Sequence, residues 1–146
     1  MGALGWFEFW RRYMLALSVI FALQGILTAL TASPDPFGIY ARILSLHFWG
    51  TPAAPSEVEA FRKFILAPMG GTLAGYFVLV LYITLYPFRE RKVWAHSAIT
   101  AGILIWFITD SAMTIYHGAY FNMYLVNLPT LVLWGLPLLF TRRYMH

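Results

Sequence analysis

Residues 64–86 read FILAPMGGTLAGYFVLVLYITLY, a run that contains no charged side chain. A helix of about 20 mostly apolar residues is long enough to cross the hydrocarbon core of a bilayer, so this run predicts a membrane span. The whole chain has 146 residues, of which 60% are hydrophobic and 11% are charged. An average soluble domain has about a quarter charged residues, so the composition also favours a membrane protein.

Three further stretches resemble this run, and together they predict a single membrane domain that covers residues 1–146. The predicted spans are residues 13–32, 64–86, 93–116 and 122–140. Residues 33–62 form the one long loop. Because backbone polar groups inside a bilayer must be satisfied by the chain itself, the predicted fold class is an all-α integral membrane protein with a four-transmembrane-helix bundle.

Basic residues are distributed unevenly between the two sides of these spans. One side has Arg11, Arg12, Arg89, Arg91, Lys92, Arg142 and Arg143. The other side has Arg42, Arg62 and Lys63, together with Asp35, Glu57 and Glu59. By the positive-inside rule both termini are cytoplasmic, which agrees with an even number of spans. The pattern predicts a multi-pass protein of the cell membrane, of the prokaryotic inner-membrane kind. The basic residues behind the net charge of +4 are thus explained by membrane orientation, so we expect no nucleic-acid partner.

The segment WRRYMLAL, residues 10–17, also has features of a twin-arginine or secretory signal. The apolar run that follows is long for a signal peptide, and no A-x-A cleavage site follows it. We therefore expect this segment to be retained as the first span.

The long loop contains a second helical pattern. The motif SPDP, residues 33–36, is expected to stop the first span and to start another helix, with Asp35 as N-cap and Pro36 in the first turn. Apolar residues then recur at helical spacing from Phe37 to Trp49. This predicts a short helix that lies in the outer interface or folds over the mouth of the bundle.

Asp110 is the only acidic residue inside the predicted spans. It lies about six residues, or roughly 9 Å, from the outer end of the third span. A charge in hydrocarbon costs several kcal/mol, so the side chain is expected to face the bundle interior or water. Asp110 is then kept neutral by desolvation, accepts hydrogen bonds from Gln24 and Asn127, or meets a cation from the outer loop. The candidate cations are Arg42, Arg62 and Lys63.

Other polar groups are expected near the depth of Asp110. The predicted polar pocket consists of Gln24, Thr72, Trp106, Asp110, Thr114, His117 and Asn127. Four of these residues follow helical spacing on the third span and predict one stripe that opens toward the outer surface. The functional interpretation is a pocket for a ligand, a lipid headgroup or a proton. The structural interpretation is a hydrogen-bonded clamp that fixes helix register, and both remain open.

Small residues recur every four positions along the second span, at Ala67, Gly71 and Gly75. Such a stripe allows another helix to approach closely, either within the bundle or from another subunit. We expect Pro68 to kink the helix beside this stripe.

No motif in the sequence specifies a reaction, a metal or a cofactor. HExxH, Walker and nucleophile-elbow patterns are absent, and the chain has no cysteine. Haem held by two histidines needs them at matching depth on facing helices, but His47, the one match for His117, lies in the loop. We therefore expect no cofactor.

These features favour a non-catalytic protein, either an accessory subunit of a membrane complex or a binder of a lipid-like ligand at the polar pocket. The expected partners are membrane lipids, other membrane subunits or further copies of the chain. The alternative is a small membrane enzyme or proton-coupled carrier that uses Asp110 with His117 as relay.

Overall fold

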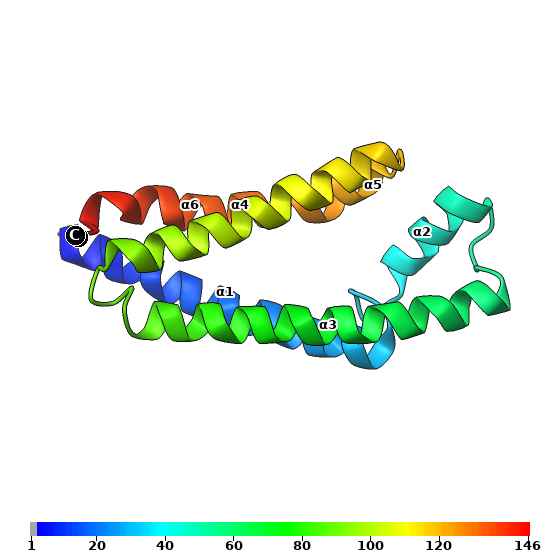
Figure 1. The fold of residues 1–146 in the computed structure, drawn as a ribbon, viewed down its shortest axis with the longest axis horizontal. Coiled ribbons are helices and arrows are strands. Elements are labelled where there is room, and N and C mark those ends of the chain that lie inside the picture. The colour runs from blue at the N-terminus through cyan, green and yellow to red at the C-terminus, as the bar shows by residue number, and fades with distance from the viewer. Residues whose placement is uncertain (1–2) are drawn as a thin grey trace. The chain divides into compact units, whose positions relative to one another are not determined.

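The structure, a computed structural model, describes residues 3–146, and all regular elements in this range are helical (Figure 1). The α-helices are α1 (Ala3–Thr31), α2 (Ile39–Trp49), α3 (Ser56–Leu85), α4 (Val93–Tyr116), α5 (Tyr120–Asn122) and α6 (Leu128–Thr141). A π-helix, η1 (Met123–Asn127), joins α5 to α6, and a 3-10 turn, η2 (Arg142–Tyr144), follows α6. The all-α prediction is thus confirmed for the described residues.

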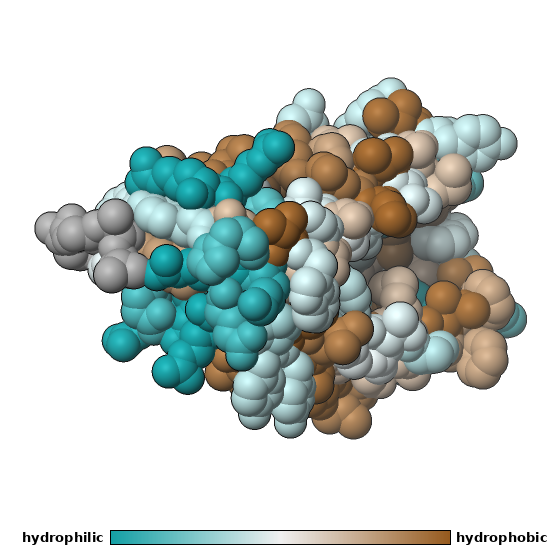
Figure 2. Space-filling model, turned by 60° about the vertical axis from the view of Figure 1, so that its left-hand side comes forward, coloured by the Kyte–Doolittle hydropathy of each residue, from teal (hydrophilic) through white to brown (hydrophobic). Residues whose placement is uncertain are grey.

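Four helical stretches are long and apolar enough to cross a membrane. They are Gly5–Thr31, Ser56–Leu85, Val93–Tyr116 and Tyr120–Tyr144. Many large apolar side chains on them are exposed, among them Leu30 at 81% and Leu139 at 72%, and apolar residues cover much of the surface in Figure 2. Such exposure is unfavourable in water and suits contact with acyl chains, so the four helices suggest a multi-pass membrane protein.

The first two of these helices begin well before the predicted spans. α1 starts at Ala3 instead of residue 13 because its charged residues pair along the helix surface. Glu8 binds Arg11 at 2.6 Å and Arg12 at 3.1 Å, which are spacings of three and four residues. The predicted bounds mark only the uncharged part of each helix.

The described residues form two compact units. The first contains the chain up to Leu17 together with Val80–His146, and the second contains Ser18–Leu79. α1 and α3 each contribute one part to both units.

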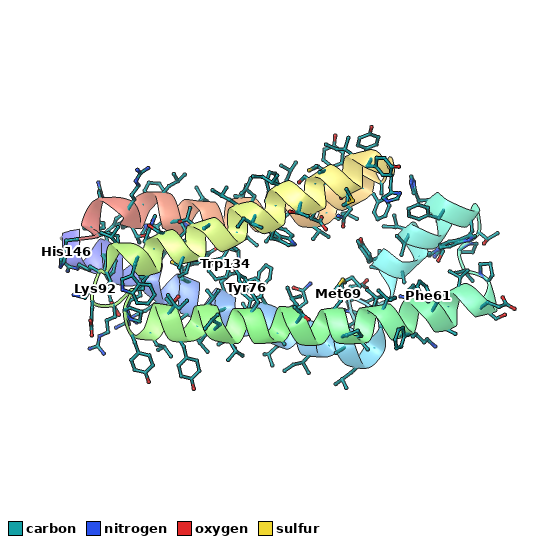
Figure 3. All side chains as sticks on the ribbon, viewed as in Figure 1. Phe61, Met69, Tyr76, Lys92, Trp134 and His146 are labelled. Carbon is teal, nitrogen blue, oxygen red and sulfur yellow. The ribbon has the colours of Figure 1, made fainter. Side chains whose placement is uncertain are left out.

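The core of the first unit is built around Trp134 of α6, which is 0% exposed (Figure 3). Phe88 is equally buried, and the ring of Phe7 from α1 stacks on it at 5.8 Å. His96 Nε2 lies 2.9 Å from the carbonyl oxygen of Leu138 and joins α4 to α6. Aromatic packing and this partly buried hydrogen bond therefore hold the N-terminal part of α1, α4 and α6 together.

In the second unit α1 and α3 are in backbone contact at two glycines. A Cβ atom added to Gly25 would lie 2.5 Å from the backbone nitrogen of Ala74 and 2.7 Å from the carbonyl oxygen of Gly70. A Cβ atom added to Gly70 would lie 2.5 Å from the carbonyl oxygen of Gly25 and would also clash with the backbone nitrogen of Ala29. This contact requires small residues four apart on both helices, namely Gly25 with Ala29 and Gly70 with Ala74.

Arg62 connects the C-terminal end of α1 to α3. Its guanidinium donates to the carbonyl oxygen of Ala32, the residue that leaves the helix with a φ of 53°. It also donates to both carboxylate oxygens of Glu59, at 2.9 and 2.7 Å. A cation at a helix C-terminus interacts favourably with the helix dipole. Arg62 and Lys63 thus both form ion pairs with Glu59, the latter at 3.8 Å. These two residues were predicted as possible cations for Asp110, and the structure pairs them with another acid.

Asp35 holds the start of α2, although the helix begins later than the sequence predicted. Its carboxylate accepts hydrogen bonds from the N–H groups of Phe37, Ile39 and Tyr40, at 2.9, 2.9 and 2.8 Å. Asp35 is not the N-cap residue, because Gly38 takes that place with a φ of 68° and the helix starts only at Ile39. Burial alone would raise the pKa of Asp35, but these three N–H donors outweigh it and hold the pKa below its ordinary value.

This capping makes the order of α2 dependent on pH. Because the pKa of Asp35 is lowered in the folded state, its contribution to stability is complete above about pH 4 and is lost as the pH falls through the folded pKa. We expect amide hydrogen exchange in Ile39–Trp49, corrected for the intrinsic rate, to accelerate below about pH 4. An Asp35→Asn variant should exchange faster already at neutral pH and lack this transition. Unchanged exchange at neutral pH in the variant would contradict the capping role.

Candidate functional site

Asp110 lies in α4 beside a cluster of neutral polar side chains in the first unit. Its Oδ2 atom accepts a hydrogen bond from Asn122 Nδ2 at 2.8 Å. The same amide group also donates to Thr114 Oγ1 at 2.9 Å and to Asn127 Oδ1 at 3.2 Å. Asn122 is therefore the centre of the cluster, and its two amide hydrogens are shared among three oxygen atoms.

The π-helix η1 determines how the cluster is built. The backbone N–H of Leu128, the residue after η1, donates to the carbonyl oxygen of Met123, five residues earlier. Residues five apart stack in such a turn, so Asn122 and Asn127 lie on the same side of the chain and face α4. Asn127 is 0% exposed and donates through Nδ2 to Ser111 Oγ at 3.0 Å. π-Helical turns occur often at functional sites, which makes this segment a candidate.

The carboxylate of Asp110 is only partly satisfied by the protein. Asp110 is half-buried, and within the described chain its one hydrogen bond is that from Asn122. None of the ion pairs among residues 3–146 involves it. Each carboxylate oxygen can accept two hydrogen bonds, so Oδ1 is left to accept a donor or a cation from outside the chain. Among residues 3–146, no second carboxylate belongs to the cluster.

The structure brings three of the predicted pocket residues into this one cluster: Asp110, Thr114 and Asn127. The hydrogen bond that we expected from Asn127 to Asp110 is made by Asn122 instead. On the remainder of the stripe, Trp106 is half-buried and His117 is exposed. Their predicted roles in a pocket stay predictions.

Gln24 and Thr72 belong to the second unit and have hydrogen bonds there. Gln24 Nε2 donates to the carbonyl oxygen of Pro34 at 3.3 Å. Thr72 is exposed, and its hydroxyl donates to the carbonyl oxygen of Pro68 at 2.9 Å, one turn earlier in α3. Pro68 lies inside α3 without ending the helix. The N–H that a proline lacks would have bonded the carbonyl oxygen of Phe64, whereas the Thr72 hydroxyl binds the carbonyl oxygen of Pro68 itself.

The predicted packing stripe faces away from the close contact in the second unit. A Cβ atom on Gly71 or Gly75 would meet no described atom within 4 Å, and Ala67 is half-buried. The contact with α1 uses Gly70 and Ala74, which lie one position away on the helix. A partner for Gly71 and Gly75 outside the chain stays a prediction.

Sequence reasoning missed Asn122 and Ser111. Asn122 stood at the predicted start of the fourth span, where a polar residue needs no explanation. An α-helical repeat also places Asn122 and Asn127 on different faces, so only a π turn relates them. The two asparagines five residues apart, close to an acid in the preceding span, are the signal that could have identified the cluster.

The described residues, 3–146, contain no group of three or more His, Asp and Glu side chains arranged to hold a metal ion. No protein-family model, curated protein or solved structure matches the chain.

Proposed function

We propose that this protein is a non-catalytic multi-pass membrane protein that binds the polar head of a lipid-like molecule at Asp110. The observation that supports this most is the unused hydrogen-bonding capacity of an acid inside a helix long enough to span a bilayer. Acids within membrane spans are costly and usually serve a ligand, an ion or a proton. The neutral amides around Asp110 orient its carboxylate, and no cation neutralises it among the residues described.

The chemistry of the site defines the class of ligand. A headgroup with hydroxyl, amine or amide donors would complete the hydrogen bonding of Oδ1. Trp106 and Met113 lie one turn before and after Asp110 on the same helix face, and Met113 is 53% exposed. These two side chains offer an apolar surface beside the carboxylate, which suits an amphiphile with an apolar tail.

In this proposal both termini are cytoplasmic and Asp110 lies in the outer leaflet of a plasma membrane of the prokaryotic kind. The excess of basic residues on the predicted side of the two termini supports that orientation. α2 then lies in the outer interface, where Trp49 at its end and Phe37 just before its start, 83% exposed, favour the headgroup region.

A second candidate is an accessory or self-associating subunit. It is favoured by the open surface at Gly71 and Gly75, which could accept a helix from another chain. This role is compatible with ligand binding at Asp110, because the two surfaces belong to different units.

The Asp110→Asn variant tests the primary proposal. It keeps the shape of the side chain and an acceptor for Asn122, but it removes the charge. We expect the variant to lose a co-purified small molecule that the wild type retains in native mass spectrometry from mild detergent. Loss of a charge-assisted hydrogen bond predicts roughly a tenfold to hundredfold weaker affinity. The melting temperature should change little, because the buried asparagines remain bonded.

A Thr72→Val variant is the control, since Thr72 is exposed and outside the cluster. Equal retention of the ligand by wild type and Asp110→Asn would disprove binding at this carboxylate. A larger complex in the same spectra would support the subunit candidate. Loss of proton uptake by Asp110→Asn in proteoliposomes would favour the carrier alternative instead.

A further inference from the structure

Within residues 3–146, five basic residues at one end of the first unit form no ion pair. They are Arg89, Arg91, Lys92, Arg142 and Arg143, and we call them the basic end. None forms an ion pair within residues 3–146, where the carboxylates that do so are Glu8 and Glu59. The five residues lie in two segments, residues 89–92 and 142–143, and Glu90 is the one acid in them. Figure 2 shows hydrophilic residues gathered on this part of the surface.

Two of these cations are held by one aromatic pair. The guanidinium of Arg91 lies over the ring of Phe7, 5.3 Å from its centre. That ring contacts Tyr144 at 5.8 Å, and the guanidinium of Arg143 lies 4.9 Å from the centre of the Tyr144 ring. Arg143 also donates to the Tyr144 hydroxyl at 2.8 Å. Both guanidinium groups are therefore positioned by the same pair of rings.

The backbone joins the two basic segments as well. The N–H of His146 donates to the carbonyl oxygen of Arg91 at 2.9 Å. Figure 3 accordingly shows His146 and Lys92 at the same end of the unit. Arg91 has a φ of 61°, a conformation that costs free energy for a residue with a side chain. These contacts hold the segments of Arg91 and Arg143 next to each other, and an anion bound there would offset their like charges.

We propose that the basic end binds the phosphate groups of anionic phospholipids, with Arg91 and Arg143 as the main contacts. The segments that carry it directly follow α3, precede α4 and follow α6, so in a membrane they lie at headgroup level. Each Lys or Arg near an anionic leaflet contributes to lipid attraction, and planar guanidinium groups bind phosphate by two parallel hydrogen bonds. The inference depends on the membrane placement of the helices but not on a ligand at Asp110.

The test titrates full-length protein in neutral detergent with phosphatidylglycerol, phosphatidylcholine or inorganic phosphate and follows binding by native mass spectrometry. We expect preferential binding of phosphatidylglycerol, weakened when salt is raised from about 0.1 M to about 1 M. The Arg91→Gln/Arg143→Gln variant should bind it about tenfold to thirtyfold more weakly. The Arg42→Gln/Lys63→Gln variant removes the same charge elsewhere and should bind like the wild type.

A second pair, Lys92→Gln/Arg142→Gln, involves exposed side chains and keeps the test valid if the first variant does not fold. We expect it to weaken binding about fivefold to thirtyfold. Equal affinity for phosphatidylglycerol in the wild type and the basic-end variants would overturn the proposal, as would equal binding of phosphatidylcholine. Displacement of the lipid by an equal concentration of inorganic phosphate would instead identify a site for free anions. An acidic protein co-purified in place of lipid would also overturn it.

Discussion

Gly25→Ala is expected to lower the free energy of unfolding by about 3 kcal/mol or more, because the new methyl group would overlap backbone atoms of α3. The added Cβ atom would lie 2.5 Å from the backbone nitrogen of Ala74 and 2.9 Å from its Cα atom. Backbone atoms cannot rotate away as a flexible side chain can, so α1 and α3 would have to separate. Overpacking of this kind costs about 1–3 kcal/mol even where side chains can adjust. The gain of about 1 kcal/mol in helix propensity from glycine to alanine does not offset it.

Two adjacent glycines in α3 provide a matched comparison. Gly70→Ala should be destabilising for the same reason, since its Cβ atom would meet the backbone of Ala29 and Gly25. Gly71→Ala should be neutral or stabilise by up to about 1 kcal/mol, because no described atom outside the local backbone of α3 lies within 4 Å of its Cβ position. Thermal unfolding in detergent measures all three variants. Equal melting temperatures for Gly70→Ala and Gly71→Ala would refute the backbone contact.

Asn127→Leu is expected to destabilise the first unit by about 2 kcal/mol. Asn127 is completely buried, and its amide links Ser111 to Asn122. Leucine has a similar volume but leaves both partners without this bond, and an unsatisfied buried polar group costs about 1–3 kcal/mol. Asn122 should also hold Asp110 less firmly, so ligand affinity at Asp110 is expected to fall together with stability.

A double-mutant cycle with Asn122→Leu separates these effects. If the two asparagines act in one network, the double variant should be less destabilised than the sum of the single variants, by about 1 kcal/mol. Leu125→Ala in the same π turn is the control, since Leu125 is exposed and its truncation should change stability little. Strict additivity of the two asparagine substitutions would show that the side chains do not depend on each other.

The number and class of the helices could be predicted from the sequence because length and charge determine them. Residues 93–116 coincide with α4 because Lys92 and the Gly118 turn bound an apolar run on both sides. The start of α1 could not be predicted in the same way. Glu8 and the following arginines are charged, but they form ion pairs along a helix that simply continues.

The rotation of each helix about its own axis could not be predicted from the sequence. The segment around Gly70 and Gly71 offers two small-residue stripes one position apart, and either could face a neighbouring helix. Only the location of α1 decides between them, and it selects Gly70 with Ala74. At the candidate site the acid itself was evident from its charge, whereas its direct partner Asn122 depended on a backbone turn with no strong sequence signature.

The π turn limits which sequence changes this segment can accept. Such a turn contains one residue more than the α-helical path between the same two ends, and here it lets Asn122 bond Asn127 while Asn127 bonds Ser111. Deleting a single residue between Asn122 and Leu128 would restore the ordinary helical repeat and direct one asparagine away from its partners. In descendants of this gene, the additional residue and both asparagines are therefore expected to be kept together or lost together.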